Sequence, residues 1–241
     1  MLFLRSAVYQ IAFLIWTAAL GIAGLPLLLA SRRAVMIFGT FWSRGVLVLL
    51  RIICGLDYEL RGGANLPAGP VIVAMKHQSA WETFATPVLF EDAASVIKRE
   101  LAWVPFYGWY TMKAGSIAID RGAGARALRS MLADASKVKA QGRKIVIFPE
   151  GTRGAVDEAR PYLPGVAALY QYLDLPLVPV AVNSGLFWKR RGFLRRPGTV
   201  LIEILPAISP GMDRRAVMER LRAEIETATA RLVAEARAKG G

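Results

Sequence analysis

The sequence predicts an α/β protein with a mixed, largely parallel sheet flanked by helices, preceded by an apolar helical hairpin. From Asp57 onward, short apolar runs alternate with longer stretches of helical periodicity, which is typical of such sheets. The residues before Asp57 differ, because long apolar segments there are interrupted by few charges. We therefore expect two parts: anchoring helices over residues 1–56, and an α/β domain over residues 57–241 that ends in an amphipathic helix.

Residues 7–30 carry no formal charge. At roughly 1.5 Å per residue, a helix of this length can cross a hydrocarbon core of ~30 Å. The stretch is longer than the apolar region of a signal peptide, which has about 7 to 15 residues. Arg32 and Arg33 follow it without a cleavage site. We expect this helix to be retained and to enter a membrane.

Residues 34–56 remain apolar but place polar residues at helical spacing. Thr40, Arg44 and Arg51 are separated by four and seven positions, so they share one stripe of a helix. This pattern predicts a helix in the membrane interface with its arginines toward lipid phosphates. Together the two segments predict a membrane-anchoring helical hairpin. It either crosses the membrane once or enters and leaves on the same side. The arginines around it favour a domain on the cytoplasmic side.

The composition points to an anionic lipid partner. Hydrophobic residues make up 54% of the 241 positions, and 31 Lys and Arg against 18 Asp and Glu give a net charge of +13. Such a surplus attracts polyanions, and the apolar composition favours lipid over nucleic acid. The single cysteine, Cys54, cannot form an internal disulfide and lies in an apolar run, which predicts a buried, inert thiol. No metal-ligand spacing or dinucleotide loop is visible, so we expect no metal and no cofactor.

The domain divides into strands and helices that follow one another without repeats. Strands are expected near residues 57–61, 70–75, 94–98, 116–119, 144–148, 177–182 and 199–204. Helices are expected near residues 80–90, 124–140, 165–173 and 212–238. Pro179 lies inside a strand and predicts an edge or a bulge. The last helix carries an apolar stripe that should pack on the domain: Val217, Leu221, Ile225, Ala228 and Leu232.

The only histidine of the chain, His77, follows the strand expected at residues 70–75. Ser79 and Glu82 match a capping box, so a helix is expected to start at Ser79. His77 would then lie at the carboxyl end of a strand, where open α/β sheets bind ligands. Glu82 could lean back toward the imidazole and make a catalytic pair. The alternative is structural, with Glu82 capping the helix and His77 serving as a loop donor.

Two further strands end in polar residues. Residues 115–121, GSIAIDR, place Arg121 after a strand, where it can bind a phosphate or pair with Asp120. Residues 145–153, IVIFPEGTR, repeat this layout with Glu150, Gly151, Thr152 and Arg153. Gly151 lets the backbone approach a ligand, Arg153 offers a second planar cation, and neighbouring donors are expected to hold Glu150.

Aromatic residues gather in two places outside these strands. Residues 103–110, WVPFYGWY, are expected to lie in the core, at the headgroup level of a membrane or along an acyl chain. Residues 186–198 interleave aromatic and basic residues. This pattern favours a membrane surface or a phosphorylated carrier, although single-stranded nucleic acid would also fit.

Four blocks in order resemble the glycerolipid acyltransferase family over about residues 56–205. They are KHQSAWE at 76–82, GSIAIDR at 115–121, FPEGTR at 148–153 and LVPVAVN at 177–183. Three features depart from the family pattern. Glu82 stands where the family usually has Asp, and Lys76 stands where it often has Asn. The family also often has a lysine just after the FPEGTR loop, where this chain has residues 162–165, YLPG, and we expect Arg160 to replace it.

The resemblance implies transfer of a fatty acyl group from acyl-CoA or acyl-carrier protein to the sn-2 hydroxyl of lysophosphatidic acid, giving phosphatidic acid. His77 would be the general base, and Glu82 would orient it. The acceptor hydroxyl is itself the nucleophile, so Cys54 is a bystander. Backbone N–H groups after Gln78 would bind the oxyanion. The acceptor would be bound by residues of the other blocks: Lys98, Arg121, Glu150, Gly151, Thr152 and Arg153.

The same blocks leave other acceptors open, a lyso-ornithine lipid or another lysophospholipid. A non-catalytic membrane-binding protein would share the anchor and the charge, but it gives no reason to combine the only histidine with FPEGTR. The partners expected are membrane lipid, a lysophospholipid and an acyl-CoA or acyl-carrier protein, with no nucleic acid. The expected location is the bacterial cytoplasmic (inner) membrane, with the catalytic domain on the cytoplasmic side.

Overall fold

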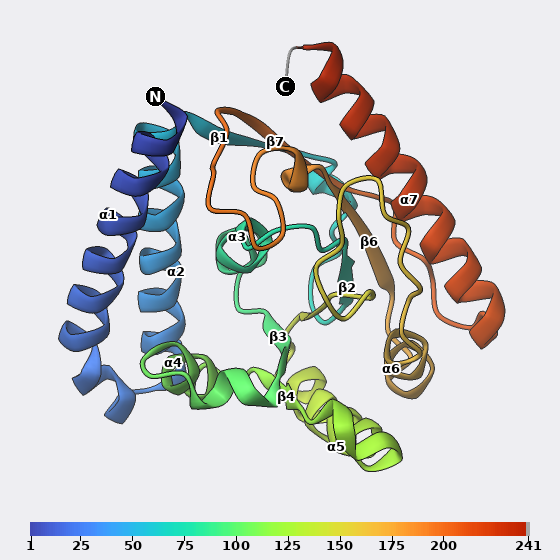
Figure 1. Ribbon diagram of the computed structural model, residues 1–241. Helices are drawn as coiled ribbons and strands as arrows, with labels where there is room; N and C mark the ends of the chain where they lie inside the picture. Colours follow the sequence, from blue (N-terminus) through green and yellow to red (C-terminus); the bar gives the residue numbers. More distant parts are fainter. Residues whose placement is uncertain (240–241) are drawn as a thin grey trace.

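A seven-stranded sheet forms the centre of the computed structural model, which describes residues 1–239 (Figure 1). The strands are β1 Leu56–Arg61, β2 Ile72–Met75, β3 Ala94–Lys98, β4 Ile117–Ile119, β5 Ile145–Ile147, β6 Leu177–Val182 and β7 Gly198–Ile204. Their order is β1-β7-β6-β2-β5-β3-β4, and every neighbouring pair is parallel except β6 and β7. The predicted mixed, largely parallel sheet is therefore confirmed.

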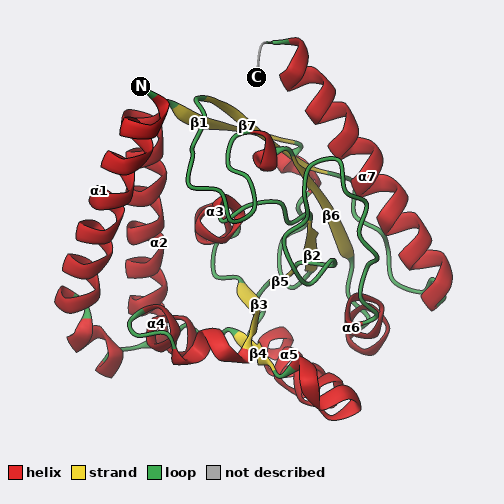
Figure 2. Cartoon of the chain, viewed as in Figure 1, coloured by secondary structure: helices red, strands yellow, loops and turns green. Residues whose placement is uncertain are grey.

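Helices flank the sheet and connect its strands (Figure 2). They are α1 Leu2–Ala23, α2 Arg32–Leu49, α3 Trp81–Leu89, α4 Tyr107–Lys113, α5 Gly124–Ala140, α6 Gly165–Leu173 and α7 Arg214–Ala238. Shorter helical turns are η1 Leu25–Leu29, η2 Leu50–Cys54, η3 Gly63–Asn65, η4 Arg99–Trp103, η5 Arg121–Ala123 and η6 Ser184–Leu186. The helix α4 is an addition to the expected elements, because the sequence analysis treated residues 103–110 only as an aromatic cluster.

Alternation along the central strands divides the core into two layers. On β2, Val73 and Met75 face a layer that includes residues of α1, η2 and α3, whereas Ile72 and Ala74 face α5, α6 and the first half of α7. Because successive side chains of a strand point to opposite faces, a strand buried on both faces is apolar at every position. β2 and β6 are indeed buried at every residue.

The N-terminal helices form the predicted hairpin, which lies along one side of the domain (Figure 1). Both are long and apolar enough to cross a membrane. Trp16 Nε1 donates to the carbonyl of Trp42 at 3.1 Å, and Trp42 Nε1 donates to Thr17 Oγ1 at 3.1 Å. These bonds satisfy the indole N–H groups inside an apolar layer and fix the two helices side by side.

One member of the predicted polar stripe, Thr40, faces the protein instead, whereas Arg44 and Arg51 are exposed. Thr40 faces α3, where its hydroxyl donates to the carbonyl of Pro87 at 3.2 Å. The reason is that α3 ends at Leu89, so the carbonyl of Pro87 has no intrahelical partner and accepts from a neighbouring helix. Arg51 pairs with Asp57 at 3.1 Å at the start of β1.

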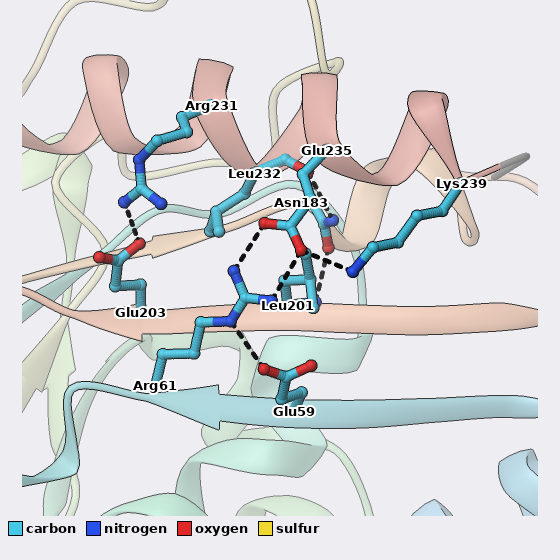
Figure 3. A network of polar contacts seen from close by, with 9 residues as sticks. All are labelled: Glu59, Arg61, Asn183, Leu201, Glu203, Arg231, Leu232, Glu235 and Lys239. Atoms are coloured by element: carbon cyan, nitrogen blue, oxygen red, sulfur yellow. Dashed lines mark hydrogen bonds and ion pairs between the residues drawn. The ribbon is translucent and has the colours of Figure 1, made fainter.

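The helix α7 packs its apolar stripe on the domain as predicted, and all five stripe residues are buried. Polar contacts fix its second half to the strands below it (Figure 3). Asn183 Nδ2 donates to the carbonyl of Leu232 at 3.2 Å, and Asn183 Oδ1 accepts from Leu201 N at 2.8 Å. Arg61 on β1 binds Glu235 at 2.6 and 2.8 Å.

The edge position predicted for Pro179 is wrong, because β6 lies between β7 and β2. The proline is tolerated through a local irregularity in the β6–β7 pairing. Val180 pairs with Ile204 and Leu177 pairs with Ile208, so two residues of one strand face three of the other. This bulge-like spacing removes the need for an N–H group at Pro179.

Candidate active site

The imidazole of His77 lies beside the carboxylate of Glu82. Nδ1 of His77 is 3.2 Å from Glu82 Oε2, and the ring stacks on Phe148 with centroids 3.9 Å apart. His77 follows β2 and Glu82 lies in the first turn of α3, so the strand-to-helix connection brings them together. The Nδ1 contact leaves Nε2 of the imidazole available for another partner.

Glu82 is fully buried and is surrounded by donors. Its carboxylate accepts from Ser79 N at 3.0 Å and from Gln78 N at 3.4 Å, and the hydroxyl of Ser184 also donates to it. Ser79 Oγ accepts from Trp81 N at 2.9 Å, which is the reciprocal pattern of a capping box, although the helix begins at Trp81 rather than Ser79. Such bonds stabilise the ionised carboxylate in a buried position.

Three amide groups at the predicted oxyanion site have acceptors within the protein. The N–H groups of Gln78 and Ser79 point to Glu82, and that of Trp81 points to Ser79. The longer side chain of Glu, compared with Asp, lets the carboxylate turn back over the start of α3. These amides are therefore occupied within the protein.

The loop after β5 holds the other side of His77. Glu150 is buried, and its Oε2 accepts from His77 N at 2.9 Å. Lys76 Nζ lies 2.8 Å from Glu150 Oε1. Burial raises the pKa of Glu150, and the neighbouring ammonium of Lys76 opposes that shift. Glu150 thus has the donors that the sequence analysis expected, and it faces the backbone of the histidine.

Gly151 has a left-handed backbone with φ of +65°. A side chain at this position would collide with Leu163, so the glycine makes room for a protein neighbour. The carbonyl of Gly151 accepts a hydrogen bond from Arg121. This bond connects the GSIAIDR block to the FPEGTR block. Gly151 also lines the cavity described next, so the close approach of a ligand stays a prediction.

A cavity of about 1070 Å³ opens beside this pair of loops. All of the predicted acceptor-binding residues except Glu150 line it, together with His77: Lys98, Arg121, Gly151, Thr152 and Arg153. Arg121 and Lys98 are exposed, and desolvation of the guanidinium by the neighbouring loops lowers the pKa of Arg121. Arg160 does not line the cavity and pairs with Glu158 at 2.7 Å.

Most of the remaining wall is apolar, and the hairpin, α3 and α4 supply much of it, although Arg190 and Arg191 also line the cavity. The aromatic residues of the lining are Phe13, Phe38, Trp42, Phe84, Phe106, Tyr107, Tyr110 and Phe148. Arg121 binds the carbonyl of Gly151, next to Thr152 and Arg153, and we call this part of the lining the cationic end. An amphipathic molecule with an anionic head matches a cavity that has both cationic and apolar side chains.

Residues 186–198 turn back onto α1. Arg195 is 5% exposed, its guanidinium lies 4.5 Å from the centroid of the Trp188 ring, and its backbone N–H donates to Ser6 Oγ at 3.0 Å. This arginine therefore has a packing role. Lys189 and Arg191 are exposed beside it, as the sequence analysis expected for the whole segment.

Three residues of the site were missed or left without a role by the sequence analysis. Ser184 donates to Glu82 from the start of η6, directly after the fourth block. Glu226 on α7 binds Lys76 Nζ at 2.7 and 3.0 Å. The signal for Lys76 was its place next to the histidine, but Glu226 is one of many charges on a long helix and has no signal of its own.

The other chemical groups give no second centre. Cys54 is buried, as predicted, and its Sγ lies 3.9 Å from the carbonyl of Arg5. Within residues 1–239 no group of three or more His, Cys, Asp and Glu could hold a metal ion.

Known proteins resemble the chain in sequence and in fold. A family model described as Acyltransferase matches residues 57–183. A 1-acyl-sn-glycerol-3-phosphate acyltransferase of Pseudomonas aeruginosa is 38% identical over 179 residues, which cover 74% of this chain and 70% of that protein. A protein of the same name from Saccharomyces cerevisiae is 32% identical over 166 residues, covering 67% of this chain and 54% of that one.

A crystal structure shares the fold. The 1-acyl-sn-glycerophosphate acyltransferase PlsC of Thermotoga maritima superposes with a TM-score of 0.75 over 95% of both chains, at 18% sequence identity. The predicted fold class, including the hairpin, agrees with this neighbour. Because the family model matches more than half of the chain and the Pseudomonas relative aligns over most of both proteins, the chain belongs to the acyltransferase family.

Proposed function

We propose that the protein transfers a fatty acyl group from a thioester to the sn-2 hydroxyl of 1-acyl-sn-glycerol-3-phosphate, giving phosphatidic acid. The observation that carries this proposal is the pairing of His77 with Glu82 beside a cavity that is lined by arginines and by many apolar side chains. The names of the bacterial and yeast relatives support the same acceptor.

In this proposal His77 is the general base. The Nδ1–H group donates to Glu82, and Nε2 takes the proton of the acceptor hydroxyl as its oxygen attacks the thioester carbonyl. The C–S bond then breaks, and the imidazolium returns the proton to the leaving thiolate. Glu82 holds the tautomer and stabilises the imidazolium during the transfer. The acceptor oxygen is the nucleophile, so no acyl-enzyme forms and Cys54 takes no part.

The cationic end of the cavity is the proposed phosphate site. Arg121 and Arg153 each present a planar guanidinium, which matches phosphate oxygens with two parallel hydrogen bonds. Lys98, Gly151 and Thr152 line the same end. The proposed acyl donor is acyl-CoA or acyl-carrier protein. With either donor, the proposed reaction needs no further cofactor.

We also propose that the hairpin lies in one leaflet at the cytoplasmic face of a bacterial inner membrane. The outer side chains of α1 are apolar and exposed, as in Phe3, Ile11 and Ile15 at 68%, 60% and 64%. The helix is held to the domain near both ends, because Ser6 accepts from Arg195 N and the carbonyl of Gly21 accepts from Tyr110 Oη. A helix fixed in this way inserts sideways with the domain beside it rather than as a free span.

Product analysis tests the acyl transfer. Purified protein is offered a panel of lyso-acceptors, including lysophosphatidic acid, lyso-ornithine lipid and other lysophospholipids, with acyl-CoA or acyl-carrier protein as donor. Mass spectrometry should detect phosphatidic acid with lysophosphatidic acid, and His77→Ala should remove it. A product formed only from another acceptor would reassign the substrate. Failure to acylate any acceptor would reject the proposal.

A further inference from the structure

Lys76, the residue before the proposed base, is a buried ammonium group. Its side chain is 1% exposed, and its Nζ donates to Glu226 Oε1 and Oε2 at 2.7 and 3.0 Å. The same Nζ also forms an ion pair with Glu150 Oε1 at 2.8 Å. One ammonium therefore links the end of β2 to the loop after β5 and to α7, which is 150 residues away in sequence.

This network continues to the backbone of His77 on both sides of the residue. The amide N–H donates to Glu150 Oε2 at 2.9 Å, and the carbonyl accepts from Gly154 N at 2.9 Å. The position of the imidazole relative to Glu82 therefore depends on where the buried carboxylate of Glu150 lies. Lys76 is the cation in contact with that carboxylate.

Glu226 and Glu150 share the ammonium of Lys76. An ammonium has three N–H donors, and both oxygens of Glu226 accept from it while Glu150 Oε1 lies 2.8 Å from the same Nζ. Tyr162 fixes Glu226 in turn, because its Oη donates to Glu226 Oε1 at 2.9 Å. Burial, followed by the nearby carboxylate of Glu226, raises the pKa of Tyr162, so the hydroxyl remains a donor.

We propose that Glu226 is a positioning residue for acyl transfer, acting through Lys76 and Glu150 on the backbone of His77. This inference rests on the proposed role of His77 as the base. Without the Glu226 carboxylate, the ammonium turns to Glu150, the Glu150 carboxylate moves, and the imidazole leaves its alignment with Glu82. The C-terminal helix thereby belongs to the working parts of the site, although Glu226 does not line the cavity.

The first test uses His77 as a unique probe, because the chain contains one histidine. Protein labelled with ¹⁵N-histidine gives one imidazole, whose Nδ1 and Nε2 chemical shifts report its tautomer and its bond with Glu82. Glu226→Gln should change both shifts. The matched control is Glu235→Gln on the same helix, since Glu235 is 27% exposed against 29% for Glu226 and also binds a cation through both oxygens (Figure 3). The control should leave the shifts unchanged.

Kinetics give the second readout. Glu226→Gln should lower kcat roughly tenfold, less than the ~100-fold that follows a full 1 Å misplacement, and should leave KM for the phosphorylated acceptor unchanged. Glu235→Gln should retain wild-type kcat. The split between kcat and KM distinguishes a shifted base from a damaged phosphate site.

Rescue gives the third readout. Lys76→Met leaves Glu150 and Glu226 without their shared cation, and we expect it to lower kcat more than Glu226→Gln does. The double variant Lys76→Met/Glu226→Gln removes one of the two carboxylates and should recover part of the loss. If Lys76→Met does not fold, the imidazole shifts of Glu226→Gln still decide the question.

Wild-type imidazole shifts in Glu226→Gln would overturn the proposal, even if its activity fell through lower stability. Equal shifts in Glu226→Gln and Glu235→Gln would also overturn it, because the effect would then belong to α7 as a whole. If wild-type protein acylates no lyso-acceptor, the proposed function fails, and the shifts still show whether Glu226 acts on His77.

Discussion

The N-terminal hairpin and the C-terminal helix α7 flank the sheet on opposite sides, and their outer surfaces differ (Figure 1). α1 has 22 residues and α7 has 25, so length does not separate them. The outer face of α1 exposes Phe3, Ile11 and Ile15, whereas that of α7 exposes charged residues such as Arg215, which pairs with Glu219 at 2.7 Å. Apolar side chains favour burial in lipid, and paired charges favour water.

The two regions also contribute different kinds of side chains to the candidate site. The hairpin supplies apolar wall, including Phe13 and Trp42, while α7 supplies the carboxylate of Glu226 behind the histidine. One side therefore supplies apolar surface and the other supplies a fixed charge, and His77 lies between these contributions. Substitutions in the two regions should consequently change different properties, lipid binding for the hairpin and catalysis or stability for α7. The following predictions test this difference.

The largest effect is expected from substitution of His77, which lies between the two regions. His77→Ala should lower kcat by roughly 10²–10⁴-fold, the usual contribution of a general base. Thioester cleavage followed by detection of the free thiol measures this loss. Cys54→Ala is the control, because the thiol is buried in the hairpin and should not affect turnover. Near-native turnover in folded His77→Ala would remove the histidine from the mechanism.

The next effect concerns the hairpin alone. Ile11→Asp/Ile15→Asp should weaken binding to lipid vesicles about a hundredfold or more, since each buried side chain of this size contributes ~1.5–3 kcal/mol. The matched control is Thr227→Asp/Ala230→Asp, which makes the same charge change on exposed positions of α7. Cosedimentation with anionic vesicles measures both. Equal loss of binding in the two double variants would mean that net charge, rather than the hairpin face, governs attachment.

A smaller effect is expected at the cationic end of the cavity. Arg153→Ala should raise KM for lysophosphatidic acid about tenfold, the lower end for a hydrogen bond to a charged group of ~1.5–3 kcal/mol. Turnover at saturation should change little, because the base is untouched. Arg196→Ala is the control, since Arg196 is exposed and does not line the cavity. An unchanged KM in Arg153→Ala would move the phosphate site elsewhere.

The sequence predicted the domain well where periodicity was strong. The strand Ala94–Lys98 and the helix Gly124–Ala140 have the expected bounds. β-branched runs and helical spacing persist there over whole elements, so local pattern and packing agree. The sequence analysis did not predict α4, because this helix has seven residues and is rich in aromatic side chains, which do not indicate a helix.

The candidate site was predicted in its residues more than in its contacts. Three of the four blocks supply His77, Glu82, Arg121 and Arg153, and they meet because parallel strands align their carboxyl ends. The direction of hydrogen bonds could not be foreseen, as with the amide of Ser79, which binds Glu82 instead of an oxyanion. Glu226 could not be predicted as a site residue, because its contact with Lys76 arises only from the packing of α7 on the sheet.

The smallest effect is expected on the α7 side and concerns stability under acid. Contacts with Arg61 and Lys239 lower the pKa of Glu235 to about 2. A carboxyl group with a depressed folded-state pKa stabilises the protein above its ordinary pKa of roughly 4.5, and this contribution is lost as the pH falls toward 2. Glu235→Gln should remove that part of the acid dependence and leave vesicle binding intact. Melting temperatures of both proteins between pH 6 and pH 2.5 measure it: the curves should converge as the pH falls. Curves that stay parallel would show that this ion pair does not hold α7 to the sheet.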